Sequence, residues 1–553
     1  MGPSPHTPGP AGAPQEPCGI LATQAEPAAP GVASLHEGGA ALVGAGEAPA
    51  GTLVCPEPEQ RPDLWPWSAR RREDGVLEIA GVSLTAVALD FATPAYVLDR
   101  ADLRGRARVW SDAMAEEFWD GYGMAGGDAF YAAKALLCAD VVDVVTQEGM
   151  GIDTASLGEL LLTLRAGADP SRVGLHGNNK LDLEIETALL AGQGQGIERI
   201  FIDSLHEVAQ VERIAASLDT TARVMVRLKT GIHAGGNEYI ATSHEDQKFG
   251  VSVADGGAME VVSAILASPH LQLLGFHNHI GSQIEGTEAF VAAVGVVMDF
   301  RARVQRELGV RTQEVDLGGG VGIAYTGADP VPTSAAEVAR ELAAAVRAAA
   351  ERTDTDVPHV SVEPGRCVVG PTTVTLYRVG AVKDVTLEGG ALRRYVSVDG
   401  GMSDNIRPAL YGAAYTATLA NRAPTGPWQR CRVVGKHCES GDVVVHDVDL
   451  PEDVRAGDLL AVPATGAYGW SMASNYNMMT KPGVLAVEQG EARWIVRPQT
   501  LEDLMGLDPG LDVGLDAGLD AGLDVETGRG DGLGTAGGQA AGREAPGGAG
   551  PAH

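Results

Sequence analysis

FYAAK at Phe130–Lys134 is the first of eight short, largely apolar runs that alternate with amphipathic stretches between about Leu98 and Arg366. The seven later runs are Gly151–Ser156, Val173–Asn178, Arg199–Ser204, Ala222–Lys229, Leu273–Ser282, Glu314–Gly320 and His359–Arg366. Alternation of this kind is typical of βαβ units and a parallel sheet. The sequence therefore predicts the α/β class, with a (β/α)8 TIM barrel.

The stretches between these runs have the spacing of helices. The clearest one begins with a capping box formed by Ser334 and Glu337. Val338, Leu342 and Val346 then follow on one face. We expect an amphipathic helix here.

Downstream of the eighth run the apolar residues alternate with a period of two. The alternating segments are Thr373–Val379, Tyr395–Asp399, Arg432–Val434 and Asp458–Val462. They predict a β-rich C-terminal domain, to which the stretch 74–97 is a candidate contributor. The expected parts of the chain are a disordered Pro/Gly/Ala-rich arm (1–62), an N-terminal segment joining the β-rich domain (63–100), the barrel (101–370), the β-rich domain (371–505) and a disordered acidic tail of Gly-Leu-Asp repeats (506–553).

Charge and composition limit the partners of the chain. With 73 acidic and 41 basic side chains among 553 residues, the net charge is −32, which argues against nonspecific binding to nucleic acid or to an anionic membrane. No basic segment followed by an apolar stretch comes after Met1, and no run of about 18 apolar residues occurs, so a cytoplasmic location is expected. The six cysteines form no CxxC pair and have no histidine at zinc-ligand spacing, which favours reduced thiols and no metal site.

Lys134 is the first candidate for chemistry. Polar residues gather at the expected carboxyl ends of the strands, where TIM barrels carry their active sites. They are Lys134, Asp153, Ser156, His176, Asn178, Asp203, Ser204, His279 and Glu363. Lys134 is one of seven lysines and has apolar neighbours, and desolvation favours the neutral amine that acts as a Schiff-base nucleophile. Taken alone, such a lysine is more often a surface residue at a strand end.

Two further motifs end the last two runs. Gly318, Gly319 and Gly320 end the seventh, and EPGR, from Glu363 to Arg366, ends the eighth. Phosphate sites in TIM barrels favour this location, where glycines let backbone N–H groups approach closely and an arginine offers a bidentate fork, although a bare GGG can also be a simple turn. A glutamate beside a phosphate is unfavourable unless it faces a cation such as a protonated pyridine nitrogen. Lysine, phosphate cradle and carboxylate together indicate pyridoxal 5′-phosphate (PLP) as the cofactor.

Other side chains have weaker signals, and two interpretations stay open for each. His279 could lie against a cofactor ring and Ser282 could reach its phosphate, but a strand-end histidine is more often a core residue. His277, two residues earlier, competes for either role. Cys438 in HCESGD could be an acid or a small hydrophobic residue. Tyr468 lies among small residues, where it could reach a ligand or merely pack.

Nine ordered motifs between about residues 63 and 505 carry a resemblance to a known family. They are YAAKAL at 131–136, HGNNK at 176–180, HEDQKFG at 244–250, HNHIGSQ at 277–283, DLGGGVGIAY at 316–325, EPGR at 363–366, DGGMSDNIRPALYGA at 399–413, CESGD at 438–442 and GAYGWSMASNYN at 466–477. With them the sequence resembles the diaminopimelate decarboxylases, which belong to the alanine racemase-like, fold type III PLP enzymes. The resemblance implies decarboxylation of meso-2,6-diaminopimelate to L-lysine and CO2, the final step of bacterial lysine biosynthesis.

The resemblance also implies a role for each matched residue. Lys134 would bind the cofactor covalently and Glu363 would pair with its pyridine nitrogen. Cys438 would come from the partner subunit of a homodimer and donate a proton. The remaining cofactor contacts would come from His279 against the ring and from Ser282, Gly318, Gly319, Gly320, Arg366 and Tyr468. The substrate would be held by Arg366, Arg407, Tyr411, Tyr468 and Glu439, the last recognising its distal ammonium group.

The sequence departs from the family pattern in places, and rival functions share part of it. Leu157 replaces a glycine in SLGEL, and the 230–240 segment TGIHAGGNEYI lacks the common leading proline, so local turns and loop contacts are expected to differ. A decarboxylase of ornithine, lysine or arginine shares the lysine, the glycines and EPGR, but Arg407 suits a substrate with a distal carboxylate. Alanine racemase is disfavoured because an arginine faces its pyridine nitrogen. A cofactor-free regulatory binding homologue is the third alternative, against which retention of Lys134 and Cys438 weighs.

Overall fold

The computed structural model describes residues 51–232 and 248–511. Most of the expected arm and tail, most of the 230–240 segment and the first part of HEDQKFG lie outside these ranges. None of the described helices is long and apolar enough to cross a membrane. The five cysteines in these ranges have free thiols.

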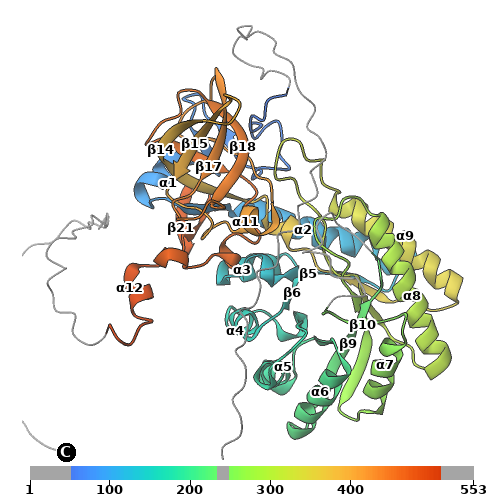
Figure 1. Ribbon diagram of the computed structural model, residues 1–553. Coiled ribbons are helices and arrows are strands. Elements are labelled where there is room, and N and C mark those ends of the chain that lie inside the picture. The colour runs from blue at the N-terminus through green and yellow to red at the C-terminus, as the bar shows by residue number, and fades with distance from the viewer. Residues whose placement is uncertain (1–50, 233–247, 512–553) are drawn as a thin grey trace, which may run out of the picture. The chain divides into compact units, whose positions relative to one another are not determined.

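Eight parallel strands close into a barrel, which confirms the predicted fold (Figure 1). They are β5 (Gly127–Ala132), β6 (Gly151–Thr154), β7 (Val173–Leu175), β8 (Arg199–Ile202), β9 (Ala222–Lys229), β11 (Leu271–Asn278), β12 (Glu314–Asp316) and β13 (His359–Val362). Pairing of β13 with β5 and of β8 with β9 closes the ring. Among the described residues, the two-residue strand β10 (Val251–Ser252) pairs only with β9.

Seven described helices follow barrel strands, and the helix that completes the outer ring precedes them. The seven are α3 (Ala139–Gln147), α4 (Leu157–Arg165), α5 (Asp182–Gly194), α6 (Leu205–Ser217), α7 (Gly257–Ala267), α8 (Glu288–Leu308) and α9 (Ala335–Thr353). Helix α2 (Arg100–Glu117) precedes β5 and packs against α3 and α9. It therefore occupies the place of a helix after β13, where the chain has only the short α10 (Arg366–Val369).

Serine caps start several of these helices directly after a strand or loop. Ser156, Ser204 and Ser334 each accept the backbone N–H of the residue three positions later, at the N-termini of α4, α6 and α9. Such a cap satisfies a backbone donor that the first helical turn leaves without a partner. In α9 the predicted face with Val338 and Leu342 is buried, so the expected amphipathic helix is confirmed. The barrel strands and the inward faces of these helices form one continuous apolar core.

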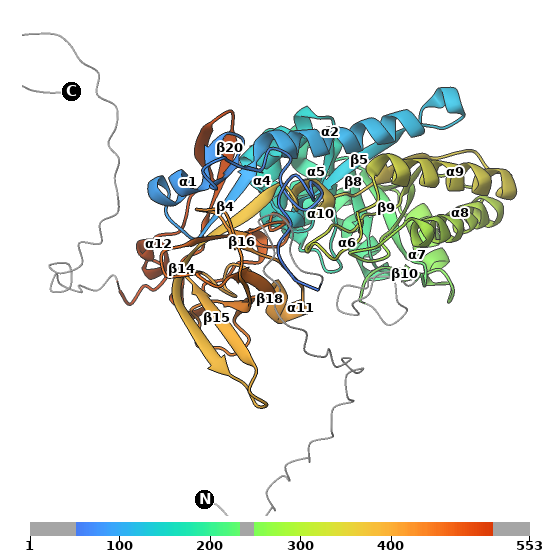
Figure 2. The same ribbon diagram turned by 90° about the horizontal axis from the view of Figure 1, so that it is seen from above.

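A second apolar core lies in the β-rich part of the chain. Its main sheet has the order β18 (Val443–Pro451), β17 (Trp428–Val434), β15 (Leu392–Val398), β14 (Thr373–Thr386), β4 (Ala95–Asp99), β20 (Gly483–Glu488) and β21 (Glu491–Val496). Strand β19 (Leu459–Val462) pairs with β14 and with β16 (Thr418–Leu419). The long strands β14 and β15 lie side by side in Figure 2, as their antiparallel pairing requires. The four predicted segments thus form strands, and β4 confirms that the chain before the barrel contributes to this sheet.

Shorter elements surround the main sheet. Strands β1 (Arg70–Arg71), β2 (Leu77–Ile79) and β3 (Val82–Ser83) form a separate three-stranded sheet, and the short helices are α1 (Leu84–Asp90), α11 (Arg407–Tyr411) and α12 (Leu501–Met505).

The chain already packs against the folded part before residue 62. The Leu53 backbone N–H donates to Asp449 Oδ2 at 2.7 Å, and Trp65 Nε1 donates to the Pro56 carbonyl at 3.0 Å. Cys55 is buried between these contacts. Ordered packing therefore begins about ten residues earlier than the boundary expected from composition.

Candidate active site

Lys134 projects into a cavity at the carboxyl ends of the barrel strands. It was expected to end the first strand, but β5 ends at Ala132 and Lys134 lies in the one-turn 3-10 helix Ala133–Ala135 that follows. Ala132, the last residue of β5, donates its N–H to the Pro364 carbonyl, in the turn after β13, at 3.3 Å. Ala133 and Ala135 are buried while Lys134 is exposed, so the turn directs the amine into the open cavity.

The cavity has a volume of about 230 Å³ and collects most of the expected site residues. Those that line it are Lys134, His279, Ser282, Gly320, Glu363, Arg366, Arg407, Tyr411 and Tyr468. They come from the four loops that follow β5, β11, β12 and β13 of the barrel and from two segments of the β-rich region. A pocket at the mouth of a barrel, with a few convergent polar groups, is the usual form of a small-molecule site.

The glycine run after β12 allows three strand-end loops to touch. Gly318 and Gly320 have φ values of +68° and +117°, which disfavour any side chain. A Cβ on Gly319 would lie 2.1 Å from the Glu363 carbonyl oxygen, and one on Gly320 would lie 2.3 Å from that of Gly281. The Glu363 N–H also donates to the Gly318 carbonyl at 2.9 Å. The run thus forms a backbone cradle that any Cβ would fill.

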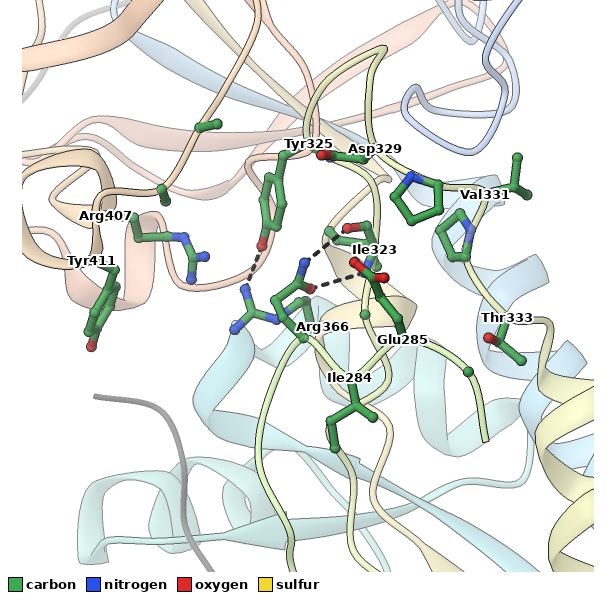
Figure 3. Close-up of a pocket in the computed structure, with 17 residues that line it drawn as sticks. Ile284, Glu285, Ile323, Tyr325, Asp329, Val331, Thr333, Arg366, Arg407 and Tyr411 are labelled. Atoms are coloured by element: carbon green, nitrogen blue, oxygen red, sulfur yellow. Dashed lines mark hydrogen bonds between the residues drawn. The ribbon is translucent and has the colours of Figure 1, made fainter. Parts of the chain in front are cut away.

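Arg366 brings a buried positive charge beside this cradle. Its guanidinium donates to the Tyr325 hydroxyl (Figure 3). It also donates to Ser282 Oγ at 2.9 Å and lies 4.5 Å from the Tyr468 ring centroid. Its Nε has no hydrogen-bond partner among the described residues. Sequence reasoning missed Tyr325, although this residue ends the quoted motif DLGGGVGIAY. A buried cation with a donor to spare favours an anionic ligand.

Arg407 supplies a second buried cation on the same side of the cavity. It begins α11, donates from Nε to the Tyr415 hydroxyl at 2.9 Å and lies 5.2 Å from the Tyr325 ring centroid. Arg366, Arg407 and Tyr411 also line an adjoining cavity of about 390 Å³, whose residues are drawn in Figure 3. The adjoining space can hold a ligand that continues from the first cavity.

Glu363 is a buried anion on the cavity wall. His176 Nε2 lies 3.1 Å and His277 Nε2 lies 2.9 Å from its Oε1. Burial alone would raise the pKa of Glu363, but the adjacent His176 and His277 hold that pKa well below its usual range. The glutamate is therefore ionised at neutral pH and can face a cationic group in the cavity.

The structure separates the roles of the two histidines that sequence analysis left in competition. His277 lies within β11 and contacts Glu363, whereas His279 lies beyond the strand end and lines the cavity. The Gly319 N–H donates to His279 Nδ1 at 3.2 Å. Burial and the nearby Lys134 hold the pKa of His279 well below its ordinary value. A neutral imidazole therefore faces the cavity beside the amine.

Cys438 and Glu439 lie outside both described cavities. Cys438 is exposed, and Glu439 accepts a hydrogen bond from the Tyr476 hydroxyl. His437 Nε2 lies 2.9 Å from Ser403 Oγ, and Asp442 accepts the N–H groups of Met402 and His437 at 2.7 Å each. Within one chain, therefore, the structure does not bring the proposed acid to the lysine.

The altered turn after the second barrel strand is well accommodated. The Leu157 N–H donates to Glu184 Oε1 at 2.9 Å, and Leu157 is the first residue of α4. Leu157, the residue that replaces the family's glycine, thus begins a regular helix.

The residues of the first cavity fit PLP. Lys134 offers an amine for the aldehyde, Glu363 an anion for the pyridine nitrogen, and His279 a neutral ring that can lie against a planar cofactor. The glycine cradle and the spare donor of Arg366 suit the phosphate. A single chain supplies all of these groups.

Comparison with known proteins agrees with this fit. Residues 102–370 match the family model described as pyridoxal-dependent decarboxylase, pyridoxal binding domain. The diaminopimelate decarboxylase of Mycobacterium tuberculosis is 44% identical over 451 residues, which cover 81% of this chain and 98% of that protein. The Bacillus subtilis enzyme of the same name is 40% identical over 441 residues, covering 80% and 97%.

Solved structures give the same result. The Helicobacter pylori diaminopimelate decarboxylase complexed with L-lysine has a TM-score of 0.68 and 30% identity, covering 77% of this chain and 98% of that one. The lysine/ornithine decarboxylase of Vibrio vulnificus shares the fold, with a TM-score of 0.59 and 21% identity. The match covers 73% of this chain and 97% of that one. The identity and the nearly full coverage of the relatives place this chain in the diaminopimelate decarboxylase family of PLP-dependent carboxy-lyases.

Proposed function

We propose that the protein converts meso-2,6-diaminopimelate to L-lysine and CO2, the last step of lysine biosynthesis. The observation that carries the proposal is the pair of buried arginines, Arg366 and Arg407, on the wall shared by the two cavities. This substrate has two carboxylates, one that leaves and one that stays. A permanently charged arginine suits the carboxylate that stays, whereas the distal amine of ornithine or lysine would gain nothing from it.

Each cavity residue has a role in this reaction. Lys134 would hold PLP covalently, while Ser282, Arg366 and Gly318, Gly319 and Gly320 would bind its phosphate. His279 would lie against the ring. When bound, PLP supplies an electron sink for the electron pair that departing CO2 leaves behind.

The chain's acidic and basic groups would then manage protons and orientation. The Glu363 carboxylate would keep a proton on the pyridine nitrogen, because an anion beside that atom favours its protonated form. Arg407 and Tyr411 would hold the distal end of the substrate, with Arg366 on the wall shared by the two cavities and Tyr468 in the first cavity. This arrangement fixes the scissile carboxylate relative to the cofactor.

We further propose that the active unit is a homodimer with the site at the subunit interface. In that arrangement Cys438 of the partner subunit would protonate the α-carbon as general acid, and Glu439 of the partner subunit would recognise the distal ammonium group. The surface around Cys438 supports the proposal, because Tyr476 and Met478 in the adjoining loop are 42% and 60% exposed. Exposed apolar side chains beside a reactive thiol are expected where a second subunit packs.

The remaining proposals concern location and domain limits. We propose a cytoplasmic location, which the free thiols of the described cysteines support. We also propose a division into a barrel (101–370) and a β-rich domain (371–505) preceded by the segment 63–100, which the two separate apolar cores support.

The direct test offers the PLP-loaded protein three substrates in parallel. We expect CO2 release from meso-diaminopimelate and little from ornithine or lysine. Lys134→Ala serves as the control and should lose both the visible absorbance of the bound cofactor and CO2 release. A higher kcat/KM for ornithine than for diaminopimelate would overturn the substrate assignment. A wild-type protein that binds no cofactor would favour a regulatory binding homologue instead.

A further inference from the structure

Two histidines converge on a single oxygen of the cofactor-facing glutamate. His176 follows β7, His277 lies within β11, and Glu363 follows β13. The Nε2 atoms of the two imidazoles lie 3.1 and 2.9 Å from Glu363 Oε1. These are close polar contacts, because none of the three atoms has a hydrogen-bond partner among the described residues. Three segments far apart in the sequence thus meet at one carboxylate.

The packing around the histidines fixes their rings. The His176 ring stacks on Phe201 at a centroid distance of 3.7 Å and an interplanar angle of 14°. The His277 ring meets the same phenylalanine edge to face at 4.9 Å, and its side chain is almost completely buried. The two Nε2 atoms therefore have little freedom to turn away from Glu363.

The charges around the carboxylate favour an ionised state. Burial alone would lower the pKa of His176, but Glu363 and Asp153 raise it above its ordinary value. Burial lowers the pKa of His277 to about 3. The raised pKa of His176 favours its cationic form, which compensates the charge of the carboxylate in the barrel interior, while His277 stays neutral. Asp153, Asp316 and Arg227 are the other charged groups around it, and carboxylate oxygens of Asp153, Asp316 and Glu363 lie within 4.8 Å of one another.

We propose that His176 and His277 are positioning residues that hold Glu363 as an anion and turn its second oxygen, Oε2, toward the pyridine nitrogen. Oε1 receives both imidazole contacts, so Oε2 is the oxygen left for a ligand in the cavity that Glu363 lines. This inference rests on the proposed function, because it assumes that PLP occupies that cavity. Neither histidine lines the cavity among the described residues, so both act through the glutamate.

The role predicts a specific pattern in variants of His277. Leucine removes the imidazole whose Nε2 contacts Oε1, and the carboxylate can then rotate or take up a proton and no longer stabilise a protonated pyridine. Glutamine restores a polar N–H group at nearly the same reach. Losing a polar contact to a charged group corresponds to roughly a 10- to 100-fold change. We therefore expect H277L to lower kcat by about that factor with little change in KM, and H277Q to recover most of the loss.

Two measurements separate this role from a general loss of structure. The visible absorbance of bound PLP is titrated with pH, and PLP affinity is measured by adding the cofactor to the apoprotein. We expect H277L to shift the absorbance titration and to weaken PLP binding, with circular dichroism unchanged. If H277L does not fold, H176L and H277Q are judged by the same two measurements.

His359→Gln is the matched control. His359 begins β13, the strand after which Glu363 lies, and its Nε2 lies 3.0 Å from Asp128 Oδ2 at the opposite end of the barrel. It is likewise an imidazole–carboxylate pair, but it does not contact the glutamate. H359Q should keep the wild-type absorbance titration and PLP affinity.

A double-variant cycle with E363Q gives the decisive outcome. If the histidines act through the glutamate, H277L should change neither the spectrum nor kcat further once Glu363 is replaced. If the kcat losses of H277L and E363Q instead multiply in the double variant, the proposal is overturned. An H277L protein with wild-type spectrum and PLP affinity would overturn it as well. If the wild-type protein binds PLP but does not decarboxylate diaminopimelate, the proposed function fails while the spectroscopic cycle still decides the role of the histidines.

Discussion

Gly319→Ala tests whether the glycine run is needed for close backbone approach. Gly319 is the middle residue of the run and, unlike Gly318 and Gly320, does not have a positive φ. Alanine is therefore compatible with the backbone conformation, and any effect of the substitution is steric. Its Cβ would lie 2.1 Å from the Glu363 carbonyl oxygen and 3.0 Å from the carbonyl carbon.

The size of the effect follows from this contact. Real Cβ atoms essentially never come closer than 3.0 Å to such an atom, so the Glu363 carbonyl must retreat by about 1 Å. Overfilling a packed site typically costs ~1–3 kcal/mol of stability. Because the retreating residue carries the carboxylate that faces the cofactor, a 1 Å displacement is expected to lower kcat/KM by roughly 100-fold.

Gly295→Ala is the matched control for this substitution. Gly295 lies inside helix α8, and a Cβ there would meet nothing within 4 Å. Alanine is the better helix former, so G295A should raise the free energy of unfolding by roughly 0.5–1 kcal/mol and leave CO2 release unchanged. Thermal unfolding, the visible absorbance of bound PLP and CO2 release are measured on both variants. Wild-type kcat/KM and absorbance in G319A would refute the steric reasoning.

Three further predictions concern the interface, the substrate and the pH dependence of stability. C438A homodimers should turn over slowly with PLP still bound. When they are mixed with K134A homodimers and the subunits exchange, activity should rise to at most about a quarter of the wild-type value. About half of the dimers are then mixed, and each mixed dimer has one of its two sites with both residues intact. No regain would contradict a site shared between subunits. R407Q should raise the KM for meso-diaminopimelate by about tenfold or more without altering PLP affinity, and an unchanged KM would show that this arginine does not hold the distal carboxylate. Burial opposes ionisation of Asp128, but the hydrogen bond from His359 and the charge of Arg172 lower its pKa to about 2. Its contribution to stability is therefore complete above the unfolded-state pKa of about 4 and is lost as the pH falls toward 2. D128N should accordingly lower the Tm at pH 6 more than at pH 3, and equal losses at both values would rule this out.

The barrel was predictable because burial on both faces makes its strands continuous apolar runs. Strand β9 was located at its actual limits, Ala222–Lys229, whereas β7 ends at Leu175 and β13 at Val362, three and four residues before their expected ends. Polar side chains lie beyond both strand ends. Glu363 and Arg366 leave the hydrogen-bonded ladder and line the cavity, whereas His176 contacts Glu363. A pattern of apolar residues cannot record these contacts.

The order of the outer helices was not predictable from the pattern alone. Repeats of strand and helix look the same whether the ring starts with a strand or with a helix. Only the packing of α2 against α3 and α9 shows that the helix before β5 fills the last place in the ring. The consequence for the site is that α10 and β14 follow β13 directly, so Arg366, the last residue of EPGR, is the first residue of α10.

The pair His277 and His279 shows where a local rule stops applying to the candidate site. Alternation along a strand places residues two apart on the same face, so sequence reasoning gave both histidines the same possible roles. Because β11 ends at Asn278, the rule holds for His277 but not for His279, which belongs to the following loop. One imidazole therefore stays among the barrel strands against Glu363 and the other faces the cavity. Residues that face a ligand can be found from strand-end patterns, whereas residues that hold those side chains in place depend on contacts between distant strands, which only the folded barrel reveals.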